Sequence, residues 1–423
     1  MSTSRSPDVG RWRGRGGAWR ALAVLAVLAL GYATWRVIGY TPYRIDIDVY
    51  RMGAQAWRDG QHLYGNALFR TGVKETSLPF TYPPMAAVLF TPFTWVSLGG
   101  AAAALTVIST VLLVVSTAIV LSALGVCTDA AVPGGPVWWR RTVLATAIVA
   151  AAIWLNMEPI MSNFGYGQIN AVLMTLVIAD CLPQRTRWPR GMLLGLAIAV
   201  KLTPAVFLLY FLLRRDRRAA LTALATLAAT ILAAFAAAPR DSVEYWTKTV
   251  FHTNRIGDTA LNTNQNFTGI LARMGFSGGP YLLLWLAVCV ATLVLTGWAV
   301  RRVLAAEQPT LALMAVALFG LLVSPVSWSH HWVWSLPTIV ILGVLGYRRR
   351  SPALLGLAAA GLALMRWSPI RLLLADSNLT QQLIGASYVW WALAVLVTAG
   401  LAVTARVEEP GVAADPAPAR LAG

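Results

Sequence analysis

Twelve apolar stretches separated by short polar loops run along the chain, and they leave few folds open to it. A membrane-spanning helix needs about 20 largely apolar residues, although tilt and local bilayer thinning accommodate shorter ones. Of the 423 residues, 57% are hydrophobic and 12% are charged, and the mean hydropathy is +0.63. We therefore predict an all-α, multi-pass membrane protein with about twelve transmembrane helices. They are expected near residues 20–39, 101–125, 141–157, 169–183, 191–201, 203–213, 219–238, 281–300, 309–325, 331–347, 352–366 and 385–405.

Arginine clusters occupy every second loop, and such clusters mark the cytoplasmic side of a membrane protein. They predict that both termini are cytoplasmic. The net charge of +17 arises largely from these clusters, so we assign it to helix orientation and expect no nucleic-acid binding. The clusters are Arg140/Arg141, Arg185/Arg187/Arg190, Arg214/Arg215/Arg217/Arg218, Arg301/Arg302 and Arg348/Arg349/Arg350.

The chain ends and two proline-containing segments complete the topology. Residues 1–18 are a basic cytoplasmic N-terminus, the first apolar stretch is too long for a signal-peptide core, and the Pro/Ala-rich tail 406–423 is expected to be disordered. Residues 82–96 contain three prolines and should lie in the outer interface without spanning. The stretch 191–213 should form a hairpin of two short passes around "KLTP" (201–204), because both flanks are basic. The alternative is one straight helix.

This topology gathers the polar segments on the extracytoplasmic face. The first loop (40–100) and the loop 239–280 are the longest of them. An active site on this side of a plasma-membrane protein is the simplest interpretation. The cysteines Cys127, Cys181 and Cys289 lie far apart, and no cluster has metal-ligand spacing, so neither a metal nor a cofactor is expected.

Asp46 and Asp48 stand at the start of the first loop, followed by Tyr50, Trp57 and Tyr64. A carboxylate at the membrane boundary can act as a general base on a sugar hydroxyl, and aromatic rings can hold the sugar. The alternative is that both are ordinary loop charges beside basic neighbours. In a helix, residues at i and i+2 cannot share a face, so only one of the two could then enter a site.

Lys201, at the tip of the expected hairpin, is a costly charge at membrane depth, which suggests a phosphate partner. The alternative is that the Lys201 side chain snorkels, so that its ammonium group reaches the outer lipid headgroups. One of His330 and His331 should bind phosphate or the carboxylate base, and the other should pack. Residues expected to bind sugar or acceptor are Tyr50, Trp57, Tyr64, Tyr82, Glu158, Tyr166, Gln168, Asn170, Asn264, Gln265, Asn266 and Trp328.

Several short motifs occur in a fixed order along the chain: "DIDVY" (46–50), "YPP" (82–84), "GQIN" (167–170), "KLTP" (201–204), "NQNFTG" (264–269) and "SPVSWSHH" (324–331). Together they resemble glycosyltransferase family 87, the actinobacterial polytopic enzymes of the GT-C fold. The resemblance covers residues 19–405 and implies one transmembrane catalytic domain with about twelve helices. It matches Asp46 to the catalytic base and places Asp48 at a variable position. Ser329 stands where relatives often carry a carboxylate, which puts an acid–histidine pair there in doubt.

The resemblance implies a hexosyltransferase that moves mannose from polyprenyl-phosphate-mannose to a hydroxyl of a glycolipid or lipoglycan. Acceptors of this kind are phosphatidylinositol mannosides, lipomannan and lipoarabinomannan. The implied mechanism is an inverting displacement in which Asp46 is the base while Lys201 and a histidine stabilise the leaving phosphate. Transfer of arabinofuranose from its polyprenyl phosphate is the alternative within the family. A lipid-linked sugar transporter is the rival from another class, and it would place ionisable groups near the bilayer midplane.

Overall fold

The computed structural model describes residues 10–40, 44–64, 69–70, 77–126, 137–373 and 377–402. The expected all-α class is confirmed, because the only strands in these ranges are the paired two-residue segments β1 (Phe69–Arg70) and β2 (Ser77–Leu78). The tail 406–423 and Cys127 lie outside the described residues.

Each of the twelve predicted stretches contains a helix. Ser97 and Asp216 accept backbone N–H groups at two of the helix starts, which satisfies donors that have no partner within the helix. Helix α1 begins ten residues before the predicted stretch, because a helix can continue into polar sequence. The corresponding helices are α1 (Gly10–Tyr40), α4 (Leu98–Ala123), α5 (Val137–Trp154), α7 (Asn170–Cys181), α8 (Met192–Val200), η2 (Thr203–Phe207) with α9 (Leu208–Leu213), α10 (Arg217–Ala237), α13 (Gly278–Ala305), α14 (Pro309–Val323), α15 (Ser335–Arg348), α16 (Pro352–Trp367) and α18 (Ser387–Ala402).

Shorter elements link these helices. They are α2 (Ile45–Arg58), α3 (Pro84–Leu89), η1 (Thr91–Trp95), α6 (Glu158–Tyr166), α11 (Pro239–Thr247), η3 (Thr249–Phe251), η4 (Thr253–Ile256), α12 (Phe267–Arg273), η5 (Ser329–Trp334), η6 (Pro369–Leu372) and α17 (Leu379–Gly385). The proline-rich segment 82–96 is therefore broken into α3 and η1, and both are too short to span a bilayer.

Four of the described helices, α1, α4, α10 and α13, contain spans long and apolar enough to cross a membrane. The number rises to six if α5 with α6, bent by 81°, and α17 with α18, bent by 56°, each form one span. Several other apolar helices are shorter, among them α7 and α14. The protein is thus a helical membrane protein, and the count of twelve stays a prediction.

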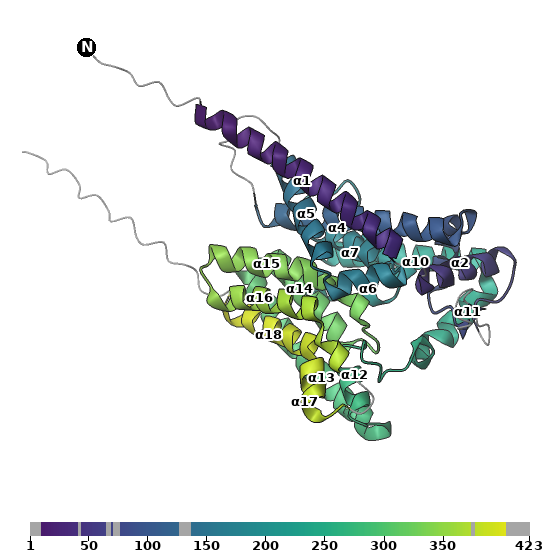
Figure 1. Cartoon of the computed structure of the whole chain (residues 1–423). Helices are drawn as coiled ribbons and strands as arrows, with labels where there is room; N and C mark the ends of the chain where they lie inside the picture. The colour runs from purple at the N-terminus through teal and green to yellow at the C-terminus, as the bar shows by residue number, and fades with distance from the viewer. Residues whose placement is uncertain are drawn as a thin grey trace, which may run out of the picture.

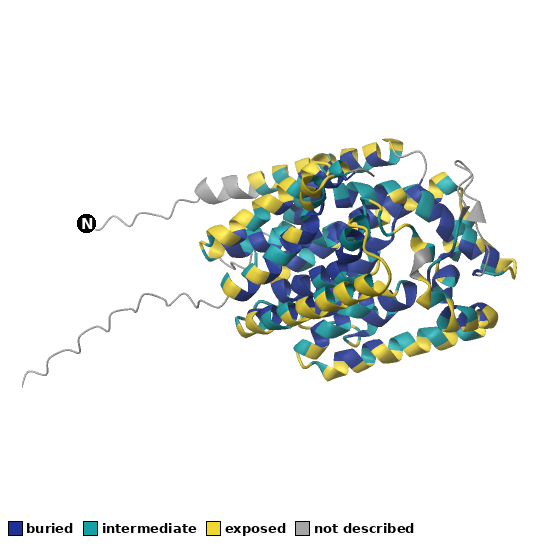
Figure 2. Ribbon diagram, turned by 90° about the horizontal axis from the view of Figure 1, so that it is seen from below, coloured by how far each residue is buried: buried dark blue, intermediate teal, exposed yellow. Residues whose placement is uncertain are grey.

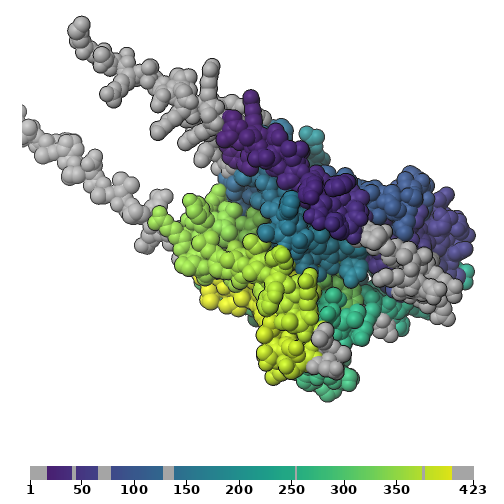
Figure 3. Space-filling view, viewed as in Figure 1, coloured from purple at the N-terminus to yellow at the C-terminus, as the bar shows by residue number. Residues whose placement is uncertain are grey.

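The outer helices carry apolar side chains on their exposed faces, as expected where lipid is the solvent. Leu25, Leu232 and Leu283 are 64%, 69% and 71% exposed. Helix α14 is enclosed by neighbours, including α13 and α18, and most of its side chains are buried. Figure 1 shows α1 lying along α5, and Figure 2 shows exposed residues along the outer helices. In the space-filling view the N-terminal and C-terminal helices form one continuous body (Figure 3).

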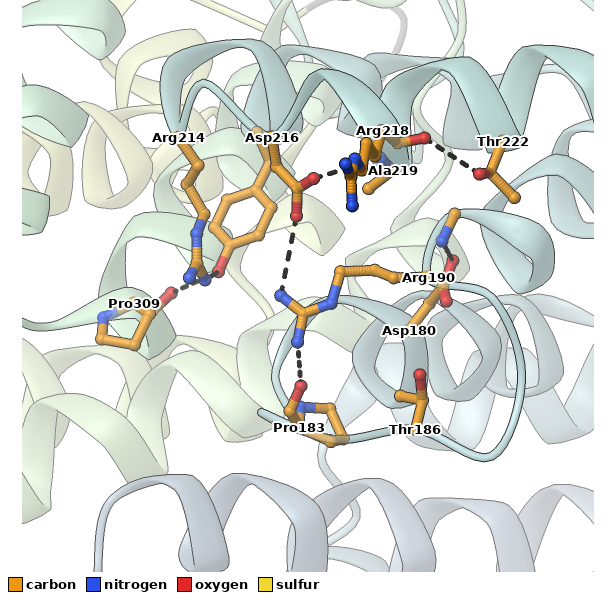
Figure 4. Close-up of polar contacts among 12 residues, drawn as sticks. Asp180, Pro183, Thr186, Arg190, Arg214, Asp216, Arg218, Ala219, Thr222 and Pro309 are labelled. Atoms are coloured by element: carbon orange, nitrogen blue, oxygen red, sulfur yellow. Dashed lines mark hydrogen bonds and ion pairs between the residues drawn. The ribbon is translucent and has the colours of Figure 1, made fainter.

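Contacts join the two ends of the predicted hairpin at residues 191–213, and its two membrane passes stay a prediction. Arg190 Nη1 lies 3.8 Å from Asp216 Oδ2, and Arg190 also donates to the Pro183 carbonyl (Figure 4). Asp180 accepts the backbone N–H groups of Gly191 and Leu194, each at 2.9 Å, and so caps the start of α8. The chain therefore runs along α8 away from the Arg190–Asp216 contact, turns at Lys201, and returns along η2 and α9.

Candidate active site

A cavity of about 830 Å³ lies where four short segments meet. Asp46 enters its wall from the first turn of α2, and Lys201 from the hairpin tip. Gln168 and Asn170 come from the turn between α6 and α7, and His330 and His331 come from η5. Residues from four of the sequence motifs therefore face one space.

The α6–α7 turn depends on Gly167. Its φ of +70° is in the left-handed region, and a Cβ at this position would lie 3.0 Å from Arg44 Cβ and 3.1 Å from Ile47 Cβ. Glycine alone meets both demands, the conformation and the close approach to α2. The turn thereby brings Gln168 beside Asp46.

Asp46 is buried in the wall and accepts a hydrogen bond from Gln168. Burial raises the pKa of its carboxyl to about 6, while the Gln168 hydrogen bond and the charge of Lys201 act in the opposite direction. At neutral pH the carboxylate is therefore ionised yet basic enough to take a proton. Such a pKa is suited to a general base.

Lys201 is held among polar partners. Its Nζ lies 3.0 Å from Asn170 Oδ1, 3.5 Å from Gln168 Oε1 and 3.3 Å from His331 Nε2. It also lies 5.6 Å from the centre of the Tyr82 ring. Burial lowers the pKa of Lys201 to about 8, and the charge of Asp46 opposes this shift. The ammonium group points at the polar end of the cavity. This geometry gives no support to the alternative that Lys201 reaches the lipid headgroups.

The two histidines have different surroundings. His331 accepts from Lys201, and burial and that positive charge lower the pKa of its ring. His330 is 5% exposed and lines the cavity, yet both of its ring nitrogens are buried without a hydrogen-bond partner. Its ring packs against Tyr166, with centroids 5.0 Å apart. A bound molecule in the cavity could satisfy these nitrogens.

Three tyrosines lie at or just behind the wall beside these residues. The Tyr50 hydroxyl lies 3.1 Å from that of Tyr82 and donates to Gln168 Oε1 at 3.2 Å. Tyr82 and Tyr166 line the cavity themselves, whereas Tyr50 lies one layer behind and orients Gln168. Trp328 also lines the cavity.

Four other predicted residues do not line this cavity. Asp48 is buried on another face of α2, as the helical spacing predicts. Trp57 donates to the Ala237 carbonyl at 3.1 Å, and Tyr64 donates to the Tyr82 carbonyl at 2.6 Å. Glu158 accepts from the Tyr388 hydroxyl at 3.2 Å and is hydrogen-bonded to Ser329, the residue that precedes the histidine pair.

The amides of "NQN" also lie outside the cavity wall. Asn264 accepts the Ser327 backbone N–H at 2.9 Å, and Asn266 caps α12 through the Gly269 N–H at 2.7 Å. Gln265 donates to the Asn262 carbonyl at 2.8 Å. These residues fold the loop against the segment that carries Trp328, because amide side chains can replace backbone partners in irregular structure.

Sequence reasoning missed an aromatic and basic part of the wall. It consists of Tyr245, His252 and Arg255 from the loop after α10, with Trp285 of α13 and Trp334 of η5. Arg255 was detectable as a cation within a loop expected on the active-site side. The tryptophans lie inside apolar stretches, where they resemble ordinary core residues.

The arrangement combines a carboxyl group that titrates near neutrality with a buried ammonium group that can stabilise an anion. Within the described ranges, no group of three or more His, Cys, Asp or Glu could hold a metal ion. Cys181 and Cys289 are free thiols. The site therefore suits the transfer of a group from a phosphate leaving group to a hydroxyl.

Fold and site together define a polytopic membrane protein with a site suited to group transfer. The family model for glycosyltransferase family 87 matches residues 80–325, and the chain belongs to that family. A polyprenol-phosphate-mannose-dependent α-(1-2)-phosphatidylinositol mannoside mannosyltransferase of Mycobacterium tuberculosis is 58% identical, over 96% of each chain. The protein of the same description from Mycolicibacterium smegmatis is 56% identical over 92% of this chain and 91% of its own.

A more distant relative from M. smegmatis is described as a phosphatidylinositol pentamannoside mannosyltransferase. It is 33% identical over 76% of this chain and 74% of its own. No solved structure matches significantly. The match of the family model begins after Asp46 and ends before the histidine pair, so it does not test either.

Proposed function

We propose that this protein transfers mannose from polyprenyl-phosphate-mannose to a hydroxyl of a phosphatidylinositol mannoside. The main support is the placement of Asp46 and Lys201 on one cavity, beside amides suited to sugar hydroxyls. The names of relatives at 58% and 56% identity support the donor and the acceptor.

The reaction is an inverting displacement in one step. Asp46 takes the proton from the acceptor hydroxyl as that oxygen forms a bond to the anomeric carbon of the donor. The bond from this carbon to the phosphate oxygen breaks, and its electron pair leaves with polyprenyl phosphate. Lys201 stabilises the negative charge that builds on the phosphate, and His331 holds Lys201. A phosphate leaving group of this kind needs no general acid.

The polyprenyl chain lies along the apolar part of the cavity. This part is formed by Leu202, Val206 and Phe207 of the hairpin together with Leu321 of α14 and Trp334. Phe207 and Trp334 pack with ring centroids 4.8 Å apart. Their position beside Lys201 suits a donor whose phosphate separates a polar sugar from an apolar tail.

The finer topology is part of the proposal. Twelve helices of a GT-C fold, with both termini in the cytoplasm, would place this cavity on the extracytoplasmic side of the plasma membrane. The alternating arginine clusters support this topology. The hairpin also supports it, because the arginine-rich segments at its two ends lie side by side.

Two alternatives remain distinct. Arabinofuranose transfer would use the same base and phosphate site, but both relatives described above at more than half identity are named for mannose. A transporter needs a route between both sides of the membrane, whereas the ionised groups here gather in one cavity lined by the hairpin tip.

The test is a transfer assay with the purified protein in lipid vesicles. Radiolabelled polyprenyl-phosphate-mannose and polyprenyl-phosphate-arabinose are offered in parallel to a phosphatidylinositol mannoside. We expect label from the mannose donor alone to reach the acceptor, and linkage analysis to find an α-1,2 bond. Transfer of arabinose, or movement of the intact donor across the membrane without transfer, contradicts the proposal.

A further inference from the structure

The charged side chains of the cavity wall form two separate groups. Among the described residues that line it, Asp46, Lys201 and Arg255 carry formal charges. Asp46 and Lys201 influence each other's pKa directly, so they belong to one end. The wall thus holds two cations and one carboxylate, and the two cations come from different segments of the chain.

Arg255 belongs to a different part of the wall. It lies in η4, and Tyr245, Thr249, His252 and Gly257 of the same loop also line the cavity. Burial raises the pKa of Tyr64. The charges of Asp241 and Glu244 add to this and that of Arg255 opposes it, so Arg255 lies near the Tyr64–Tyr245 pair and near both carboxylates. Lys201, in contrast, contacts Gln168, Asn170 and His331.

The loop is anchored to the elements that carry the site. Asp241 of α11 accepts the Leu63 backbone N–H at 3.0 Å, which fixes α11 to the segment after α2. Gly257 has φ +141°, and a Cβ there would lie 3.0 Å from the Trp328 ring. Figure 1 shows α11 at the same end of the molecule as α2. Arg255 is therefore positioned by packing on both sides.

The outer surface of this loop is suited to contact with lipid. Phe251 is 74% exposed and does not line the cavity, whereas Ile256 and Leu261, 42% and 48% exposed, belong to the cavity wall. The cation Lys248 is exposed between α11 and η3. Exposed apolar side chains beside basic ones are typical of segments that lie at the headgroup level of an anionic membrane.

We propose that Arg255 binds the phosphodiester of the anionic glycolipid acceptor at the rim of the cavity, while Lys201 binds the donor phosphate. This inference rests on the proposed function. A guanidinium group offers paired donors that match phosphate oxygens. With its phosphate fixed at Arg255, the acceptor extends its sugar chain toward Asp46, and Phe251 lies on the lipid side.

The experiment measures initial rates in vesicles of neutral phospholipid, with each substrate varied in turn. For Arg255→Met we expect the acceptor KM to rise about tenfold to a hundredfold, the range for loss of one charge-assisted hydrogen bond. The donor KM and kcat at saturating acceptor should change less than threefold. Arg255→Lys should recover part of the loss, since it keeps the charge without the paired donors.

Two controls separate a phosphate site from other roles. Lys248→Met removes a neighbouring exposed charge that does not line the cavity, and it should leave the acceptor KM near that of the unsubstituted protein. A synthetic alkyl oligomannoside without phosphate should compete equally well for the Arg255→Met variant and the unsubstituted protein.

An equal loss of affinity for the natural acceptor and for the phosphate-free oligomannoside, or an acceptor KM that does not move, overturns the inference. An equal rise with Lys248→Met also does, because general attraction of an anionic lipid then explains the effect. Failure of the unsubstituted protein to transfer mannose at all is a different result, and it removes the proposed function itself.

Discussion

Asp46 and Asp48 are two residues apart, yet helix α2 places them on different faces. Asp46 lines the cavity beside Gln168 and Lys201, and Asp48 is buried elsewhere. If Asp46 is the base, Asp46→Asn keeps the shape but cannot take a proton, so kcat should fall about 10²–10⁴-fold. Asp48→Asn should cost far less. Transfer rates of both purified variants, with donor binding measured separately, check this. An active Asp46→Asn enzyme would move the base to another carboxylate.

The pH dependence of kcat/KM provides a second test at the residue scale. The pKa of Asp46 is raised to about 6, and the base must be deprotonated, so activity should fall as pH drops through that value. The pKa of Lys201 is lowered to about 8, and the phosphate needs the ammonium form, so activity should also fall as pH rises through that value. We therefore expect kcat/KM, measured from about pH 5 to about pH 9, to follow a bell-shaped curve.

Lys201→Arg distinguishes the two limbs of that bell. A guanidinium group stays charged across this range, so the fall on the alkaline side should disappear while the acid side remains. If the alkaline fall persists in Lys201→Arg, a group other than Lys201 controls it.

The sequence singled out cavity-lining residues where the chemistry of a side chain is unusual for its setting. A lysine within an apolar stretch and carboxylates beside a membrane boundary point to function, and Lys201 and Asp46 do line the cavity. Amides and aromatics carry no such signal. Asn264 and Asn266 satisfy backbone groups, and Tyr64 packs behind the wall, because the same side chains serve structure and binding equally well.

At the scale of elements, the hairpin positions Lys201, and its first limb packs closely on α10. A Cβ at Gly195 would lie 2.5 Å from the Ala223 carbonyl oxygen and 2.6 Å from Thr226 Cβ. Gly195→Ala should therefore push α8 away from α10 and destabilise the protein by about 1–3 kcal/mol. Thermal unfolding in detergent measures the loss. Gly343→Ala in α15, where a Cβ would meet nothing within 4 Å, is the matched control and should leave the melting temperature unchanged or slightly higher.

The hairpin could be predicted because two independent signals agreed: Pro204 interrupts the apolar stretch, and both flanks are basic. The contacts at the start of α8 could not be predicted. There Asp180 caps α8, and its proximity to α8 depends on the packing of α7 against α8. The same holds for η5. A sequence pattern places a turn before α15, but only tertiary contacts decide which histidine meets Lys201.

At the scale of the whole molecule, hydropathy predicted where helices form better than how they cross the bilayer. All twelve stretches are helical, yet α7 and α14 are short, and α14 is enclosed by protein. Length alone does not decide whether such helices span, because a helix buried among others does not need to match the bilayer thickness by itself. The side of the membrane that the cavity faces stays a prediction from the arginine loops.

That side can be tested with single cysteines and a membrane-impermeant thiol reagent in intact cells. Phe251→Cys, on the loop beside the cavity, should be labelled from outside, because its side chain is 74% exposed. Arg187→Cys, in the exposed arginine loop after α7, should react only after the membrane is permeabilised. The background is a chain whose native cysteines are replaced by alanine, with transfer activity confirmed first. Labelling of Arg187→Cys from outside, with Phe251→Cys protected, would invert the topology and place the mannose donor and acceptor on the cytoplasmic face.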